Sequence, residues 1–197
     1  MRTKASGEST LLLLDAVEVL RTENVDYAIV GAMAASVHGV IRASRDADAL
    51  LSISTSALKG LEQSFKTAGF GTELRRGDMS DPISAVLALH DKFENRVDLL
   101  VGIRGFDLAA FSRVIEVPFD GESLKFVGLE DFVAMKLFAG GPQDIADAQN
   151  ALEAMPEPPD TKLLRELATR YGADTTRSLE KLLKSLDHNL DSGPELE

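Results

Sequence analysis

The chain has 197 residues, 44% of them hydrophobic and 27% charged, an ordinary composition for a folded protein with one main domain. Its net charge of −11 argues against broad binding to a nucleic-acid backbone, and the lack of cysteine excludes disulfides and thiolate metal sites. The apolar run 11–14 is too short for a signal peptide or a membrane span. We therefore expect a cytoplasmic protein without membrane contact.

The first half of the chain alternates predicted helices and strands. We expect the polar residues 1–8 to fray, and Ser9 or Thr10 to cap the first helix. Thr55 or Ser56 is the corresponding cap of a later helix. The expected elements are helices over residues 10–22, 32–37 and 55–68, and strands over residues 27–30, 46–54, 70–74, 83–89 and 96–101.

Helices dominate the second half of the chain. Two short strands, 114–117 and 124–127, flank an Asp120-Gly121 turn, and a stiff Pro-rich linker spans residues 156–160. The sequence therefore predicts an α/β (α+β) protein with a mixed β-sheet core flanked by helices. We expect this core over residues 1–127, a C-terminal helical region packed on it over 128–190, and a disordered tail over 191–197. The helices expected in that region span residues 129–139, 142–155, 161–170 and 174–187.

Two aspartates, Asp46 and Asp48, open one of the predicted strands. Residues i and i+2 of a strand point to the same face, so the two Cα atoms lie about 6.6 Å apart. Two carboxylates at this spacing repel each other unless a cation lies between them, and Mg²⁺ prefers oxygen ligands. A pair of solvated acids at the mouth of a strand has the same pattern, so the pair needs further support.

Asp98 is the single acid of the strand-like run 95–100. If this strand lies beside the strand of Asp46, three carboxylates converge in a site that can hold one or two metals for phosphoryl or nucleotidyl transfer. A structural ion pair between Asp98 and either Arg96 or Arg104 is the alternative.

The turn at Gly31 is a second candidate part of a site. A strand that ends in glycine and continues into a helix of small residues lets backbone N–H groups approach a phosphate, although small residues also occur there for packing. Arg42 and Arg45 follow in the loop before the acids, and of the two we expect Arg42 to contact a phosphate. Gly31 precedes Asp46 by fifteen residues, which links the turn to the acidic pair.

The order of these residues resembles the nucleotidyltransferase superfamily of the polymerase-β type. The resemblance rests on Val30-Gly31-Ala32, Asp46-Ala47-Asp48 and Val97-Asp98-Leu99. The segments 38–46, 129–136 and 141–147 are similar to the bacterial branch that includes the AbiEii-like toxins. The likeness covers roughly residues 25 to 153 and implies a nucleotidyltransferase core.

The resemblance implies a metal-dependent enzyme that moves a nucleoside monophosphate from an NTP to an acceptor hydroxyl and releases pyrophosphate. Asp46 and Asp48 would bind Mg²⁺ or Mn²⁺ and, through it, the triphosphate. Asp98 would complete the metal site and help to deprotonate the attacking hydroxyl. The backbone at Gly31 and Ala32 would hold the β and γ phosphates.

Lys136 and Asp144 match a lysine and an aspartate of the AbiEii-like branch, and the resemblance implies that they serve nucleotide binding and catalysis. An exposed lysine with a buried stem is the alternative for Lys136. For Asp144 and Asp147, the alternative is a pair of acids that favour the N-terminal end of their helix.

Two positions depart from the family pattern. Ala32 stands where the family has Gly or Ser, and residues 140–143 lack the basic residues often found before the aspartate that Asp144 matches. These departures leave an alternative function, a catalytically degenerate protein of the same fold that acts as a regulatory or toxin–antitoxin component. The acceptor stays open between tRNA, a protein hydroxyl and a small molecule.

Overall fold

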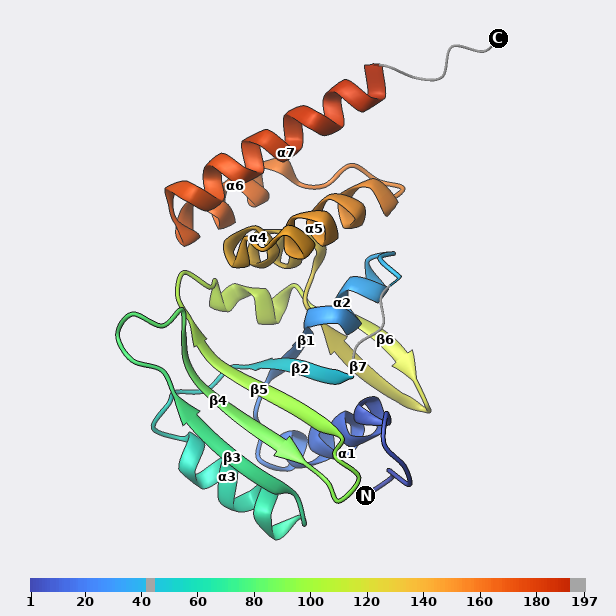
Figure 1. Ribbon diagram of the computed structural model, residues 1–197, viewed down its shortest axis with the longest axis vertical. Coiled ribbons are helices and arrows are strands. Elements are labelled where there is room, and N and C mark those ends of the chain that lie inside the picture. The colour runs from blue at the N-terminus through green and yellow to red at the C-terminus, as the bar shows by residue number, and fades with distance from the viewer. Residues whose placement is uncertain (42–44, 192–197) are drawn as a thin grey trace. The chain divides into compact units, whose positions relative to one another are not determined.

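A mixed seven-stranded sheet and seven α-helices make up residues 1–41 and 45–191, the part of the chain that the computed structural model describes (Figure 1). The expected α/β class is thereby confirmed. The chain divides into two compact units. The first comprises Met1–Val37, Ile41–Arg104 and Leu108–Gly128, and the second comprises His38–Val40, Gly105–Asp107 and the chain from Leu129 on.

The first unit contains the whole sheet. Its elements are α1 (Ser9–Thr22), β1 (Tyr27–Val30), α2 (Gly31–Val37), β2 (Asp46–Leu51), α3 (Leu58–Thr67), β3 (Gly71–Arg76), β4 (Ile83–His90), β5 (Arg96–Ile103), the 3₁₀ helix η1 (Leu108–Ser112), β6 (Ile115–Phe119) and β7 (Glu122–Phe126). The strands lie in the order β3-β4-β5-β2-β1-β7-β6. Strand β2 runs parallel to β5, and β1 runs parallel to β7, whereas the other neighbours are antiparallel.

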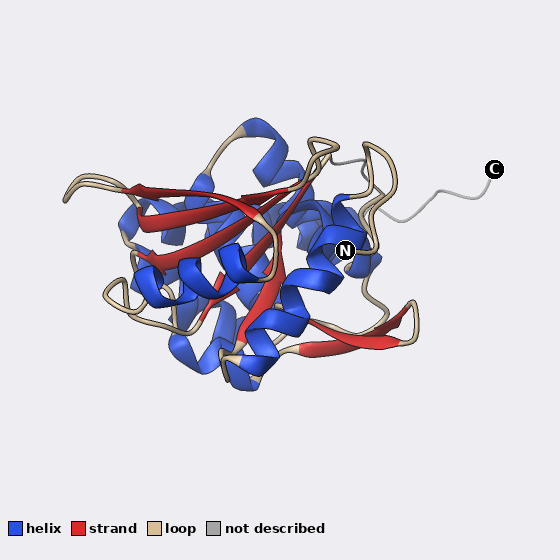
Figure 2. Cartoon of the chain, turned by 90° about the horizontal axis from the view of Figure 1, so that it is seen from below, coloured by secondary structure: helices blue, strands red, loops and turns tan. Residues whose placement is uncertain are grey.

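Helices α1 and α3 cover one face of the sheet (Figure 2). Helix α1 packs on β2 and β5, and α3 packs on β3 and β4. The side chains that face α1 are apolar and buried, among them Ala47, Val97 and Leu99. Because side chains alternate along a strand, Asp48 and Asp98 point to the opposite face.

Helix α1 begins at Ser9, and the predicted cap by Ser9 or Thr10 is wrong. The residue in the cap position is Glu8. The hydroxyl of Ser9 instead donates to the carbonyl of Arg45 and accepts a hydrogen bond from the backbone N–H of Arg96 at 3.1 Å. Ser9 thus ties the start of α1 to the starts of β2 and β5.

The predicted fraying of residues 1–8 is also wrong, because the buried side chain of Asn95 holds this segment. Its amide donates to the carbonyl of Ala5 at 2.7 Å and to the carboxylate of Asp91 at 2.9 Å. Its Oδ1 accepts the backbone N–H of Glu8 at 2.7 Å. A side chain far along the sequence therefore orders the N-terminal segment.

Two further differences have local causes. Thr55 and Ser56 do not cap α3, which begins at Leu58 after Ala57 in the cap position. The hydroxyl of Ser56 is hydrogen-bonded to that of Ser54 at 2.7 Å. The short η1 was not predicted, since five residues give too little periodicity to recognise.

The second unit is helical. Its helices are α4 (Leu129–Ala139), α5 (Pro142–Ala154), α6 (Thr161–Tyr171) and α7 (Ala173–Asp191). Helix α4 packs against the other three, and α6 packs against α7. Asp160, at the end of the Pro-rich linker, caps α6 by accepting the N–H of Leu163 at 2.9 Å. Over residues 1–41 and 45–191, no helix is both long enough and apolar enough to cross a membrane.

Both tyrosines of the chain are expected to titrate above their ordinary pKa. Burial raises the pKa of Tyr171, and the nearby charge of Asp131 raises it further. Burial also raises the pKa of Tyr27. A raised folded-state pKa means that the native state holds the phenolic proton more tightly than the unfolded chain. This contribution to stability is fully present below about pH 10 and is lost as the pH rises through the folded values.

A spectrophotometric titration of phenolate absorbance tests this expectation. In native protein both transitions should lie above about pH 10, and in urea they should merge near that value. Tyr171→Phe should leave one transition, that of Tyr27. Native phenols that ionise at the same pH as in urea would contradict the burial of both rings.

Candidate functional site

Three aspartates lie on one face of the parallel strands β2 and β5. Asp48 and Asp98 are register partners, so their side chains are direct neighbours across the two strands. Asp46 faces the same side because it precedes Asp48 by two residues, and its own partner on β5 is Arg96. The strand of Asp98 therefore lies beside the strand of Asp46, which is the condition for the three carboxylates to converge.

Gly31 lies against the carboxylate of Asp48. It begins α2 with φ at +65°, in the left-handed region that favours glycine. A Cβ atom built on Gly31 would collide with Oδ2 of Asp48. This proximity follows from the register, since Val30 pairs with Asp48 across β1 and β2. The strand-to-helix turn and the acidic pair thus form one local structure, in which a side chain at position 31 would collide with Asp48.

Replacing Gly31 by Ala is expected to lower the free energy of unfolding by about 2–3 kcal/mol, because the new methyl group adds a collision with Asp48 to the strain of positive φ. Gly121→Ala is a matched control: Gly121 has φ at +78°, but open space surrounds the position of its Cβ. We expect about 1 kcal/mol there, from backbone strain alone. Urea denaturation followed by circular dichroism measures both, and equal losses would mean that the turn does not press on Asp48.

The carboxylate of Asp98 is bound on both oxygens by Arg96. The guanidinium donates from Nε to Oδ1 at 2.8 Å and from a terminal nitrogen to Oδ2 at 3.1 Å. The hydrogen bond to Asp98 raises the pKa of Arg96, and the negative charges of Asp46 and Glu73 add to this effect. Of the two arginines named from the sequence, Arg104 instead donates to backbone carbonyls of residues 79–81.

The three aspartates have the donor chemistry for a hard divalent cation, because all their ligand atoms are carboxylate oxygens. In the structure, Arg96 already binds both oxygens of Asp98. Within residues 1–41 and 45–191, no group of three His, Asp or Glu side chains is arranged to hold a metal ion.

Lys136 lies in a polar cluster of the second unit. Its Nζ is 2.8 Å from Oδ1 of Asp144 and 2.8 Å from Oδ2 of Asp147. Only 11% of the Lys136 side chain is exposed, so the alternative of a surface lysine is wrong. Asp147 is completely buried, and its other oxygen accepts a hydrogen bond from Gln143 at 2.8 Å.

Comparison with known proteins gave no match to any family model and no match to a curated protein. Solved structures are similar. The solution structure of the antibiotic-resistance factor ANT(2'')-Ia has a TM-score of 0.58 at 13% sequence identity, over 93% of this chain and 98% of that one. The crystal structure of that factor with adenylyl-2''-tobramycin has a TM-score of 0.56 at 13% identity, over 83% and 96% of the two chains.

A third structure, of a Thermotoga maritima protein assigned as a nucleotidyltransferase, has a TM-score of 0.52 at 16% identity, over 78% of this chain and 98% of that one. This chain has the nucleotidyltransferase fold. The resemblance seen in the sequence therefore holds at the level of the fold.

The burial of Asp147 is not evident from the sequence. There, Asp147 is only the i+3 neighbour of Asp144 on a helix, a spacing that also suits two solvated acids. Its complete burial beside Lys136 makes it a partner of the predicted lysine. Arg42 lies outside the described residues, and Arg45 is exposed.

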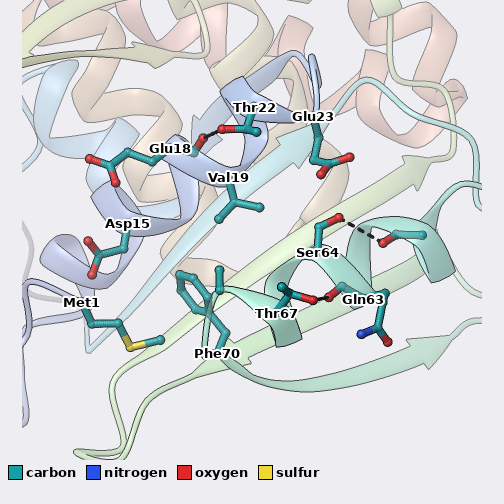
Figure 3. A pocket seen from close by; sticks show the side chains of 12 residues that line it. Met1, Asp15, Glu18, Val19, Thr22, Glu23, Gln63, Ser64, Thr67 and Phe70 are labelled. Atoms are coloured by element: carbon teal, nitrogen blue, oxygen red, sulfur yellow. Dashed lines mark hydrogen bonds between the residues drawn. The ribbon is translucent and has the colours of Figure 1, made fainter.

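A pocket of about 690 Å³ is lined mostly by residues of α1 and α3, together with Met1 and Phe70 (Figure 3). Two of its three acids, Asp15 and Glu18, are paired with Arg2 at 3.0 and 2.5 Å. The hydroxyls of Thr22 and Thr67 donate to backbone carbonyls. None of the predicted site residues that the structure describes lines this pocket, so its size alone does not mark the candidate site.

Proposed function

We propose that this protein transfers a nucleoside monophosphate from an NTP to a hydroxyl group of an acceptor and releases pyrophosphate. The observation that supports the proposal is the row formed by Asp48 and its register partner Asp98, with Asp46 on the same face and Gly31 packed against Asp48. In this nucleotidyltransferase fold, the paired carboxylates therefore lie next to a glycine turn, on the central strands of the sheet.

Asp46, Asp48 and Asp98 are the candidate ligands of Mg²⁺ or Mn²⁺ in this proposal. When bound, such a cation neutralises charge on the phosphate oxygens of the reacting nucleotide. Asp46, Asp48 and Asp98 would hold the cation, and Asp98 would also accept the proton of the attacking hydroxyl. The remaining contribution of the protein is to hold charged groups in place.

The nucleotide is held by backbone and basic groups. Backbone N–H groups at Gly31 and Ala32 donate to the terminal phosphates, and Arg42 adds a positive charge. For Lys136 and Asp144, the roles in nucleotide binding and catalysis are those that the sequence resemblance implies. Because Lys136 is held by two carboxylates, we assign it a fixed orientation within its unit.

A small-molecule hydroxyl is the acceptor that we favour. The net charge of −11 disfavours a polyanionic acceptor such as RNA. The antibiotic-resistance factor of the same fold has been solved with an adenylylated tobramycin, which is a nucleotidylated small molecule. We carry over the chemical class, a small molecule with an acceptor hydroxyl, and no particular compound.

Mass spectrometry of acceptor mixtures tests the proposed function. Purified protein is incubated with each NTP, with Mg²⁺ or Mn²⁺, and with pools of hydroxylated small molecules, tRNA and proteins. The expected result is an acceptor whose mass rises by one nucleoside monophosphate less water, together with release of pyrophosphate. Pyrophosphate release without a modified acceptor would point to hydrolysis and would contradict the proposal.

A non-catalytic protein of the same fold, acting as a regulatory or toxin–antitoxin component, is the second candidate. It is favoured by Ala32, which lacks a hydroxyl, and by the engagement of Asp98 with Arg96. Thermal-shift titration separates the two candidates: Mg²⁺-dependent stabilisation by an NTP favours the enzyme, and indifference to every NTP favours the second candidate.

A further inference from the structure

Arg96 binds the carboxylate of Asp98, the third acid of the candidate site, more tightly than a typical surface ion pair is bound. Two parallel hydrogen bonds join its planar guanidinium to Asp98, the strongest geometry that these groups form. The Asp98 side chain is 19% exposed and that of Arg96 is 36% exposed, so solvent screens the pair only partly. Arg75 adds a more distant charge, 4.0 Å from Oδ2 of Asp98.

The position of Arg96 in the sheet explains this contact. Arg96 and Asp98 are i and i+2 on β5, so their side chains leave the same face. Arg96 is the register partner of Asp46 on one side and of His90 on the other. The guanidinium therefore lies on the face that holds all three aspartates.

The same side chain also borders a second location. A depression of about 270 Å³ beside the aspartate row is lined by Arg96 and by Glu73, His90 and Glu94, among others. Glu73 and Glu94 give this depression negative charge. A guanidinium that leaves Asp98 can therefore turn toward the carboxylates that line this depression.

We propose that Arg96 is a positioning residue that competes with a divalent cation for Asp98. The inference rests on the proposed function, in which Asp46, Asp48 and Asp98 bind that cation. A cation and a guanidinium repel each other and cannot both use the two oxygens of Asp98. Arg96 holds the carboxylate in place when no cation is bound, and it moves toward the depression when the cation binds.

Titration of the folded protein with Mn²⁺, without nucleotide, measures this competition directly. Free Mn²⁺ is followed by electron paramagnetic resonance in wild type and in Arg96→Gln. Loss of the competing guanidinium should tighten Mn²⁺ binding by about tenfold. Arg96→Lys keeps the charge but loses the paired hydrogen bonds, and its affinity should fall between the two.

Arg75→Gln is the matched control for a general electrostatic effect. It removes one positive charge near Asp98, but Arg75 is 4.0 Å away and 52% exposed, so its removal should change the affinity by less than about twofold. In Arg96→Gln, the added substitution Asp98→Asn should abolish the gain, because the competition acts through that carboxylate.

Affinity for Mn²⁺ that is unchanged or weaker in Arg96→Gln overturns the inference, as does equal tightening in Arg75→Gln. Absence of Mn²⁺ binding in both wild type and Arg96→Gln overturns it too. Circular dichroism checks that each variant is folded. If Arg96→Gln is unfolded, the Mn²⁺ affinity of Arg96→Lys tests the inference instead: tighter binding than in wild type supports it, and unchanged or weaker binding overturns it. Tighter binding without nucleotidyl transfer to any acceptor would sink the proposed function alone, whereas transfer with Mn²⁺ affinity indifferent to Arg96 would sink only this inference.

Discussion

Replacing Asp48 by Asn is expected to lower nucleotidyl transfer by about a thousandfold or more. The amide keeps the shape of the side chain but removes the charge that the proposed cation needs. Asp48 is central to the row, because it pairs with Asp98 across β2 and β5 and packs against Gly31. The measurement is transfer of label from an NTP to the acceptor found by mass spectrometry.

Asp26→Asn is the matched control for Asp48→Asn. Asp26 is 69% exposed, is paired with Lys125 at 3.3 Å, and lies outside the aspartate row, just before β1. Its amide variant should keep transfer within about threefold of wild type, since an exposed acid contributes only a small electrostatic effect. Unchanged transfer in a folded Asp48→Asn protein would show that the aspartate row does not take part in the reaction.

Replacing Asp147 by Asn is expected to lower the free energy of unfolding of the second unit by about 3 kcal/mol. Asp147 is completely buried, and it is one of two carboxylates that neutralise Lys136. Removing its charge leaves a lysine that is 11% exposed with Asp144 as its remaining acid in the cluster. The chain has no tryptophan, so urea denaturation should be followed by far-ultraviolet circular dichroism.

Asp144→Asn provides the comparison within the same cluster. Asp144 is 29% exposed, and water can replace part of what Lys136 loses. We expect a loss of about 1 kcal/mol or less, because a partly exposed ion pair contributes little. Equal losses in the two variants would show that burial of Asp147 is not what stabilises the cluster.

The aspartate row was accessible to sequence reasoning because its parts follow simple periodicities. Asp46 and Asp48 face one side of a strand whatever its neighbours are, and Gly31 marks the end of the preceding strand. The sequence does not show that β2 and β5 are neighbours in the sheet. That pairing is parallel and long-range, so no turn between the two strands announces it.

The partners of the site residues were much less accessible. From the sequence, Arg96 and Arg104 are equal candidates for an ion pair with Asp98. The structure shows that Arg96 forms this pair, whereas Arg104 donates to a backbone carbonyl of the loop between β3 and β4. Asp147 and Asn95 look like ordinary polar residues in the sequence, yet both are buried and bonded. Such contacts depend on tertiary packing, which local propensity does not encode.

The parallel pairings of the sheet delay assembly of the aspartate row during synthesis of the chain. Strands β1 and β2 are neighbours in the sequence and can pair as soon as both have emerged from the ribosome, which brings Gly31 beside Asp48. Their outer partners come much later, since β2 waits for β5, and β1 pairs with β7 through Ile29 and Phe126. Until then the nascent chain exposes two unpaired strand edges, a condition that favours slow folding and aggregation.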